Sequence, residues 1–192
     1  MAAAAAAVLF AAVLLLLFSA AAALFAAVLL FFISAGPATP AQVEKETHIK
    51  LYWQDILSGP SPTAVQVARA ATTNTSKTFF GTVTVIDDPL TAGPGLNTSR
   101  IMGRAQGTYV SAGKDTQAFL MNMNFVFAAG EHAGSSVAIM GRSEVAAAVR
   151  ELAVVGGTGK FRWARGYALA RTCSLDVVTG DATVEYNVFV RH

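Results

Sequence analysis

Apolar and polar residues alternate along most of the chain beyond residue 36. The alternation falls into nine segments bounded by Gly, Pro, Asp or Asn, a pattern typical of strands with one buried face. The predicted strands are 48–57, 64–70, 79–86, 101–110, 117–128, 135–141, 149–155, 161–172 and 182–190. Eight or nine antiparallel strands in one domain predict an all-β fold, either a barrel or a sandwich.

The faces of two strands favour a barrel that holds a ligand. In AFLMNMNFVF, one face carries only large apolar residues: Phe119, Met121, Met123, Phe125 and Phe127. In IMGRAQGTY, one face is mostly small: Ile101, Gly103, Ala105, Gly107 and Tyr109. Small inward residues leave room, and a closed eight-stranded barrel is just wide enough for side chains or one small ligand. The Met and Phe face could equally pack on a neighbouring subunit.

The N-terminal region has a different composition. Residues 1–33 carry no charged side chain, and the first ionisable side chain is Glu44. We predict that residues 1–36 are a signal peptide or an uncleaved membrane anchor, that 37–47 are a linker, and that 48–192 form the barrel domain. The barrel is then expected in the secretory lumen or outside the cell.

Charge and cysteine content exclude several classes of function. The net charge is only +2, without a basic block, so a nucleic acid partner is not expected. Cys173 is the only cysteine, which excludes an intrachain disulfide. His48, His132 and His192 have no Cys or carboxylate at metal-ligand spacing, so we expect no metal, and no cofactor fingerprint is found.

Two sequons are candidate glycosylation sites. Asn74 and Asn97 each begin an Asn-Thr-Ser triplet in a polar connection between predicted strands. A glycan in such a connection would project without disturbing the packing.

The stretch VVGGTGKFRWARGYALA has a glycine-rich turn that ends in lysine. Lys160 is followed by Phe161 rather than by a hydroxyl residue, and strand periodicity follows, so nucleotide binding is not expected. On the predicted strand, Arg165 shares a face with Phe161, Trp163 and Tyr167. There it could stack on the rings, pair with a buried carboxylate or orient a phenolic ligand; the structural alternative is an ion pair.

Asp55 falls on an apolar strand face in HIKLYWQDIL. Parity places it with Ile49, Leu51, Trp53 and Leu57. If this face is the barrel interior, burial should raise the pKa of Asp55 and make it a usable proton donor or acceptor. If the strand ends at this point, Asp55 lies at a solvated rim instead.

Other candidate residues have a functional and a structural interpretation. Tyr109, at the end of the small-residue face, could hydrogen-bond a phenol or serve as a core aromatic residue. Asp87 and Asp88 precede Pro89, an order typical of a turn, so we predict a structural role for Asp88. The chain has no nucleophile-elbow serine, which argues against a serine hydrolase.

The chain is similar to plant dirigent proteins over almost all of its predicted mature part. Seven segments carry the resemblance in the family's order: LYWQDILSGPSPTAVQVA, FFGTVTVIDDPLT, GRAQGTYVS, LMNMNFVF, GSSVAIMGRS, VVGGTGKFRWARGYALART and DATVEYNVFVRH. The resemblance implies an eight-stranded antiparallel barrel of the dirigent and allene-oxide-cyclase type. It also implies a homo-oligomer, a trimer or a dimer, that is secreted to the apoplast.

The resemblance further implies stereoselective coupling of monolignol-type phenoxy radicals toward lignans. An external laccase or peroxidase makes the radicals, and the dirigent protein has no oxidative centre of its own. Asp55, Arg165 and Tyr109 match the family's pocket residues, and Asp88 and Lys160 are further candidates. Alternatives are a quinone-methide dehydratase or cyclase on the same barrel and a phenolic-binding cell-wall protein. This sequence departs from the family at Gln54, commonly His, and at Lys160, which stands where pinoresinol-forming members carry an acid.

Overall fold

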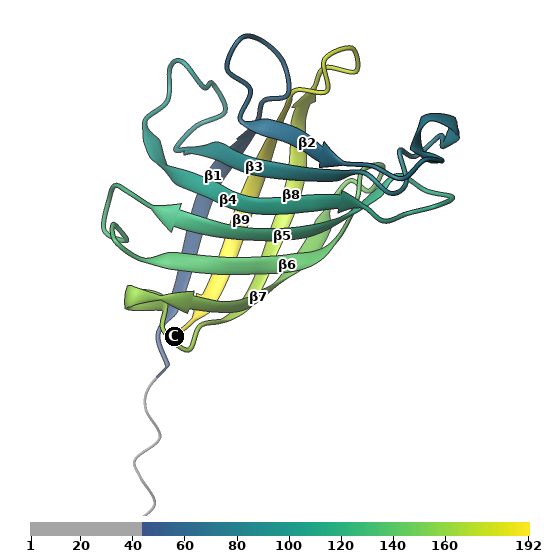
Figure 1. Cartoon of the computed structure of the whole chain (residues 1–192). Coiled ribbons are helices and arrows are strands. Elements are labelled where there is room, and N and C mark those ends of the chain that lie inside the picture. Colours follow the sequence, from purple (N-terminus) through teal and green to yellow (C-terminus); the bar gives the residue numbers. More distant parts are fainter. Residues whose placement is uncertain (1–43) are drawn as a thin grey trace, which may run out of the picture. The chain divides into compact units, whose positions relative to one another are not determined.

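Nine strands and two short 3₁₀ turns make up the regular structure of the part of the chain that the structure describes. The computed structural model describes residues 44–192 (Figure 1). The strands are β1 (Glu46–Asp55), β2 (Ala64–Ala68), β3 (Val83–Thr91), β4 (Ile101–Ser111), β5 (Ala118–Phe127), β6 (Ser136–Glu144), β7 (Arg150–Thr158), β8 (Arg165–Leu175) and β9 (Ala182–Arg191). The turns are η1 (Thr73–Thr75) and η2 (Gly159–Phe161). The predicted signal segment lies outside the described residues.

The sheet is antiparallel and closes on itself. Its order is β1-β9-β8-β7-β6-β5-β4-β3-β2, and β1 also pairs with β3 through Tyr52 opposite Thr91 and Trp53 opposite Leu90. The short strand β2 pairs with the first half of β3, beside this seam. Eight strands therefore form the closed barrel, and the predicted eight-stranded antiparallel barrel is confirmed. In Figure 1, β3 to β7 cross the front, with β1, β9 and β8 behind them.

Strand direction assigns each loop to one of two ends of the barrel. Pairing of β1 with β9 runs from Glu46 opposite Arg191 to Asp55 opposite Ala182. We call the end with Asp55 and Ala182 the Asp55 end; the β1–β2, β2–β3, β4–β5, β6–β7 and β8–β9 loops lie there. At the opposite, terminal end, Lys45 and His192 exchange backbone hydrogen bonds of 2.9 and 3.0 Å. Within residues 44–192, no helix is long and apolar enough to span a membrane.

Large side chains fill the middle of the barrel. The alternation predicted on β5 is observed, because Met121, Met123, Phe125 and Phe127 are buried. They pack in one core cluster with Tyr186 of β9, whose ring meets the Phe125 ring edge-on at 5.2 Å. The β5 face therefore belongs to the core, rather than to a subunit contact.

Two small residues of β4, Gly103 and Gly107, have a role in strand packing. A Cβ atom on Gly103 would lie 2.0 Å from the carbonyl oxygen of Val126, and one on Gly107 would lie 2.0 Å from that of Asn122. Both glycines therefore allow β4 to approach β5 closely. These contacts give the two glycines a packing role that the alternation did not predict.

The strand β3 begins and ends later than predicted. It includes Asp87, Asp88 and Pro89, so the predicted turn at this position is wrong. The Asp87 N–H donates to the Thr63 carbonyl on the β2 side, so the nitrogen of Pro89 faces the same side. On that side of β3, no strand pairs with the residues between Ile86 and Leu90. The missing N–H of proline therefore removes no ladder hydrogen bond.

Candidate functional site

Asp55 lies at the end of β1 with its side chain in the barrel. Ile49, Leu51 and Trp53 share its face and are buried, as the parity predicted, and Asp55 itself is 8% exposed. Its Oδ1 atom is buried and has no hydrogen-bond partner among residues 44–192. The buried alternative therefore describes Asp55, and the solvated-rim alternative does not.

A second carboxyl group, that of Asp88, enters the barrel from β3. It is fully buried. The Trp53 indole N–H donates to its Oδ2 atom (2.7 Å), and the Thr63 hydroxyl donates to its Oδ1 atom (2.5 Å). Two inward carboxyl groups thus lie on paired strands beside the seam.

The two carboxyl groups differ in how easily they lose a proton. Burial, with a smaller contribution from the charge of Asp88, raises the pKa of Asp55 to about 8. Burial also raises the pKa of Asp88, to about 6, while its bonds from Thr63 and Trp53 oppose the shift. Between these values Asp55 carries a proton and Asp88 is ionised, which separates an acid from a base in one site.

Tyr109 completes the site from β4. It is buried, and its ring meets those of Trp53 (6.3 Å) and Phe119 (5.2 Å) edge-on. Burial, together with the charge of Asp55, raises the pKa of Tyr109, so its hydroxyl stays neutral. A neutral phenol near two carboxyl groups can donate a hydrogen bond to either carboxylate or to a ligand oxygen.

Arg150, at the start of β7, is an inward cation that the sequence reasoning missed. It is 7% exposed, its Nη1 donates to the Thr172 hydroxyl (2.7 Å), and its buried Nε has no partner among residues 44–192. Burial lowers its pKa, while nearby Tyr186 opposes that shift. The signal was present, because Arg150, Leu152 and Val154 alternate on one face. A buried donor without a partner is suited to hold an anionic ligand oxygen.

Arg165 lies outside the barrel, so its predicted place on an inward aromatic face is wrong. The chain turns through η2, and Trp163 (φ 66°) lies in the turn with 89% of its surface exposed. The strand β8 begins only at Arg165, and its inward residues are Ala168 and Ala170. The Arg165 guanidinium forms an exposed ion pair with Glu44 at 2.7 Å, which is the structural alternative.

Lys160 is also far from Asp55. It lies in η2 at the terminal end, where its ammonium group donates to the Glu131 carbonyl and its backbone N–H donates to the Ser135 hydroxyl (3.1 Å). At this terminal end β1 begins with Glu46, which is nine residues before Asp55. Nine residues of a strand span about 30 Å, so the two ends of β1 are well separated. Lys160 therefore does not occupy a second acid position beside Asp55, whereas Asp88 does.

The remaining predicted residues lie on the surface or near the terminal end. Asn74 in η1 and Asn97 in the β3–β4 loop are both exposed. Among residues 44–192, no group of three or more His, Cys, Asp or Glu side chains could hold a metal ion. The rings of His132 and His192 each lie 5.0 Å from that of Phe161.

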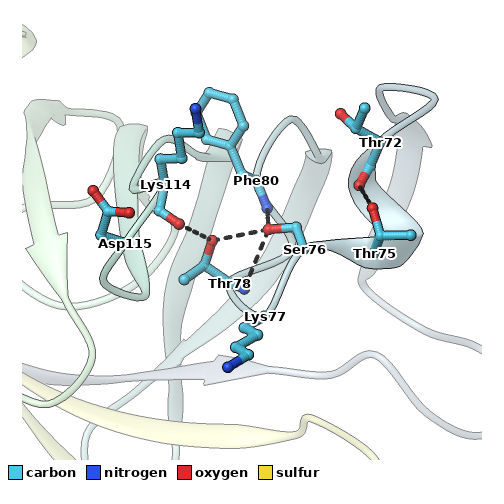
Figure 2. Close-up of a pocket in the computed structure, with 8 residues that line it drawn as sticks. All are labelled: Thr72, Thr75, Ser76, Lys77, Thr78, Phe80, Lys114 and Asp115. Atoms are coloured by element: carbon cyan, nitrogen blue, oxygen red, sulfur yellow. Dashed lines mark hydrogen bonds between the residues drawn. The ribbon is translucent and has the colours of Figure 1, made fainter.

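A surface hollow of about 400 Å³ lies at the Asp55 end between the 72–80 and 114–115 segments (Figure 2). Figure 2 shows Thr78 joining the two segments, since its hydroxyl donates to the Lys114 carbonyl (3.3 Å). Lys77, Phe80 and Asp115 also line the hollow, but none of the inward residues described above does. The hollow is therefore separate from the Asp55 site.

Comparisons with known proteins agree with this fold. A family model described as Dirigent-like protein matches residues 46–191. The chain is 51% identical to Dirigent protein 21 of Arabidopsis thaliana over 149 residues, 78% of each chain. It is 45% identical to Pterocarpan synthase 1 of Glycyrrhiza echinata over 152 residues, 79% of this chain and 80% of that one.

A solved structure shows the same likeness. The structure of a pterocarpan synthase dirigent protein matches this one with a TM-score of 0.73 at 46% sequence identity. The match covers 79% of this chain and 97% of that chain.

Proposed function

The chain belongs to the dirigent-like protein family, and we propose that its Asp55 site binds phenolic intermediates and directs the stereochemistry of their coupling and ring closure. The intermediates are monolignol-type phenoxy radicals made by an external laccase or peroxidase. Two radicals react quickly without help, so the protein needs only to disfavour the wrong approach. A preference of about 1.4 kcal/mol gives a tenfold product ratio.

The acid and base pair of Asp55 and Asp88 is the observation that supports this proposal. Coupling leaves a quinone methide, whose ring closure needs a proton on its oxygen and the removal of one from the attacking hydroxyl. Protonated Asp55 delivers the first, and ionised Asp88 accepts the second, so the protons balance. Arg150 and Tyr109 hold the oxygen on which negative charge would develop.

Product analysis tests the proposal directly. Purified protein is added to laccase and coniferyl alcohol, and the product enantiomers are separated. We expect an excess of one enantiomer, lost in Asp55→Asn, which keeps the size of the side chain but cannot donate the carboxyl proton. A racemic mixture unchanged by the protein would count against this substrate; other phenols are then assayed in the same way.

A second candidate is a cyclase that acts without an oxidant. Two observations favour it: Asp55 is protonated below about pH 8, and relatives at 45 and 46% identity are called pterocarpan synthases. A protonated carboxyl group can give its proton to a leaving hydroxyl group, which departs as water, while ionised Asp88 takes the proton of the phenol, so that a neutral quinone methide forms. Turnover of an isoflavanol without oxidant, lost in Asp55→Asn, would support this candidate, and full turnover by the variant would exclude it.

We also propose that the protein is secreted to the apoplast and glycosylated at Asn74 and Asn97. The uncharged N-terminal 33 residues and the exposure of both asparagines support this. Enzymatic removal of N-glycans from the secreted protein should lower its mass. Asn74→Gln and Asn97→Gln should each lower the mass of the glycosylated protein by that of one glycan. An unchanged mass would contradict the proposal.

Assembly as a homo-oligomer, a trimer or a dimer, is supported by an apolar outer face. Met140, Ala153, Tyr167 and Phe189 are paired in one row across β6, β7, β8 and β9. The Tyr167 ring stacks on that of Phe189 at 4.9 Å, yet Tyr167 stays 41% exposed and Met140 42%. A contiguous exposed apolar face of this kind marks a surface that another protein covers, and a second copy of the chain is the proposed occupant.

A further inference from the structure

A third carboxylate, that of Asp181, contacts the chain just beyond Asp55. Asp181 precedes Ala182, which pairs with Asp55. Its Oδ1 accepts hydrogen bonds from the backbone N–H groups of Leu57 (2.8 Å) and Ser58 (3.0 Å). Its Oδ2 accepts one from the Ser58 hydroxyl (2.5 Å). One side chain thus receives three donors from the start of the β1–β2 loop.

The place of Asp181 at the end of a ladder explains these contacts. Pairing of β1 with β9 stops at Asp55 and Ala182. The N–H groups of the residues that follow β1 therefore have no strand carbonyl opposite them. An ionised carboxylate is a stronger acceptor than a neutral carbonyl. The Ser58 hydrogen bond is the largest effect that lowers the pKa of Asp181, which keeps the carboxylate charged. The Asp181 side chain therefore supplies the acceptor for the N–H groups of Leu57 and Ser58 just beyond the end of the ladder.

The far end of the same loop reaches the second carboxyl group of the site. The N–H groups of Thr63 and Ala64 both donate to the Ile56 carbonyl (2.8 and 3.0 Å), which closes the loop at its base. The Thr63 hydroxyl then donates to Asp88. The loop is therefore a covalent link from Asp55 to the residue that binds Asp88, and Asp181 holds its second and third residues, Leu57 and Ser58.

We infer that Asp181 is a positioning residue, which fixes the β1–β2 loop through Leu57 and Ser58 and thereby orients Asp55 and Asp88 toward a bound ligand. This inference rests on the proposed function of the Asp55 site. Without Asp181 the Asp55 carboxyl can take several directions. The bond-forming reaction then continues, but its preference for one face of the ligand falls.

The test compares two carboxylates of the same turn. Asp181→Ala should speed hydrogen exchange at the Leu57 and Ser58 amides, and it should lower the enantiomer ratio of the product about tenfold. Asp176→Ala is the matched control, since the Asp176 carboxylate accepts N–H bonds only from Val178 and Thr179 of its own turn. The control should leave both readouts at their wild-type values.

Two milder variants keep the test informative if Asp181→Ala does not fold. Asp181→Asn keeps an acceptor oxygen for both backbone donors and should retain most of the enantiomer ratio. Ser58→Ala removes only the hydroxyl bond and should lower the ratio by less than Asp181→Ala does. Equal losses in Asp181→Asn, Ser58→Ala and Asp176→Ala would overturn the positioning role.

Asp55→Asn separates failure of this inference from failure of the proposed function. If Asp55→Asn gives a racemic product while Asp181→Ala keeps the wild-type ratio despite faster exchange, the positioning role is wrong and the proposed function stands. If Asp55→Asn itself keeps the wild-type ratio, the proposed function is wrong, and the inference that rests on it is overturned as well.

Discussion

Asp55 should make the barrel less stable as the pH rises. Its pKa is raised by burial to about 8 in the folded protein, from an ordinary value of 3.8. Below about pH 4 the carboxyl group is protonated in both the folded and the unfolded protein, so its ionisation takes nothing from the free energy of unfolding. Between pH 4 and 8 only the unfolded chain releases the proton, which favours unfolding. Asp55→Asn abolishes this titration. The free energy of unfolding of the variant, minus that of the wild type, should therefore be larger at pH 8 than at pH 4 by several kcal/mol.

Denaturant unfolding at pH 4, 6 and 8 measures this difference. The control is Asp88→Asn, for which the difference from the wild type should develop mainly between pH 4 and 6, because burial raises the Asp88 pKa only to about 6. A difference between Asp55→Asn and the wild type that does not change with pH would show that Asp55 titrates as an exposed carboxyl.

Arg150→Met should stabilise the fold and weaken its function. No carboxylate among residues 44–192 lies within ion-pair distance of Arg150, and its buried Nε has no partner. Methionine fills a similar volume without charge, so the free energy of unfolding should rise by about 1–2 kcal/mol. Loss of the donor for a ligand oxygen should lower the product enantiomer ratio.

Chemical denaturation and product analysis of the same Arg150→Met sample test both expectations. Arg150→Lys keeps a buried charge and should gain no stability. A destabilised Arg150→Met would mean that the hydrogen bond to Thr172 outweighs the burial of the guanidinium.

Strand parity locates inward residues only where the strand itself is assigned correctly. Asp55 lies in a continuous strand, so counting in twos from Ile49 places it inside. Arg165 follows a turn with a positive φ at Trp163, and counting across that turn assigns it the wrong face. Asp88 was a further candidate by resemblance, but the residue order assigned it to a turn because Asp before Pro is typical of one; here the Pro89 nitrogen faces a gap in the strand pairing.

The close approach of β4 and β5 should make two glycines of β4 irreplaceable. In Gly103→Ala and Gly107→Ala the new Cβ atom would lie 2.0 Å from a carbonyl oxygen of β5, so the strands must separate. We expect each substitution to lower the free energy of unfolding by more than about 2 kcal/mol. Gly156→Ala in β7 is the matched control, because a Cβ there meets no atom within 4 Å.

Thermal and denaturant unfolding of the three variants check this prediction. The control should lie within about 0.5 kcal/mol of the wild type. Wild-type stability of Gly103→Ala would show that β4 and β5 can separate freely at this point. The sequence could not reveal these contacts, because alternation shows which face a glycine shares but not how closely an adjacent backbone approaches it.

At the scale of the whole molecule, the outer surface divides into faces with different chemistry. Across β3 and β4, exposed Asp87 receives hydrogen bonds from Arg104 and Gln106, so this face carries charged and polar groups beside exposed Val85. Across β6 to β9, the row through Met140 and Tyr167 has no charged member, although charged residues flank it along the strands. The row, rather than the face at Asp87, is therefore the surface we expect a second copy to cover.

Tyr167→Glu should convert the oligomer into a monomer. A stable interface buries on the order of 1,200–2,000 Å² with an apolar centre, and a carboxylate placed there loses its hydration without gaining a partner. Light scattering during size-exclusion chromatography should show a fall to the mass of one chain. Val85→Glu on β3 is the control, because Val85 is similarly exposed (44%) but lies on the face that carries Asp87. An unchanged mass for Tyr167→Glu, or a monomer produced only by Val85→Glu, would show that the β6 to β9 row is not the interface.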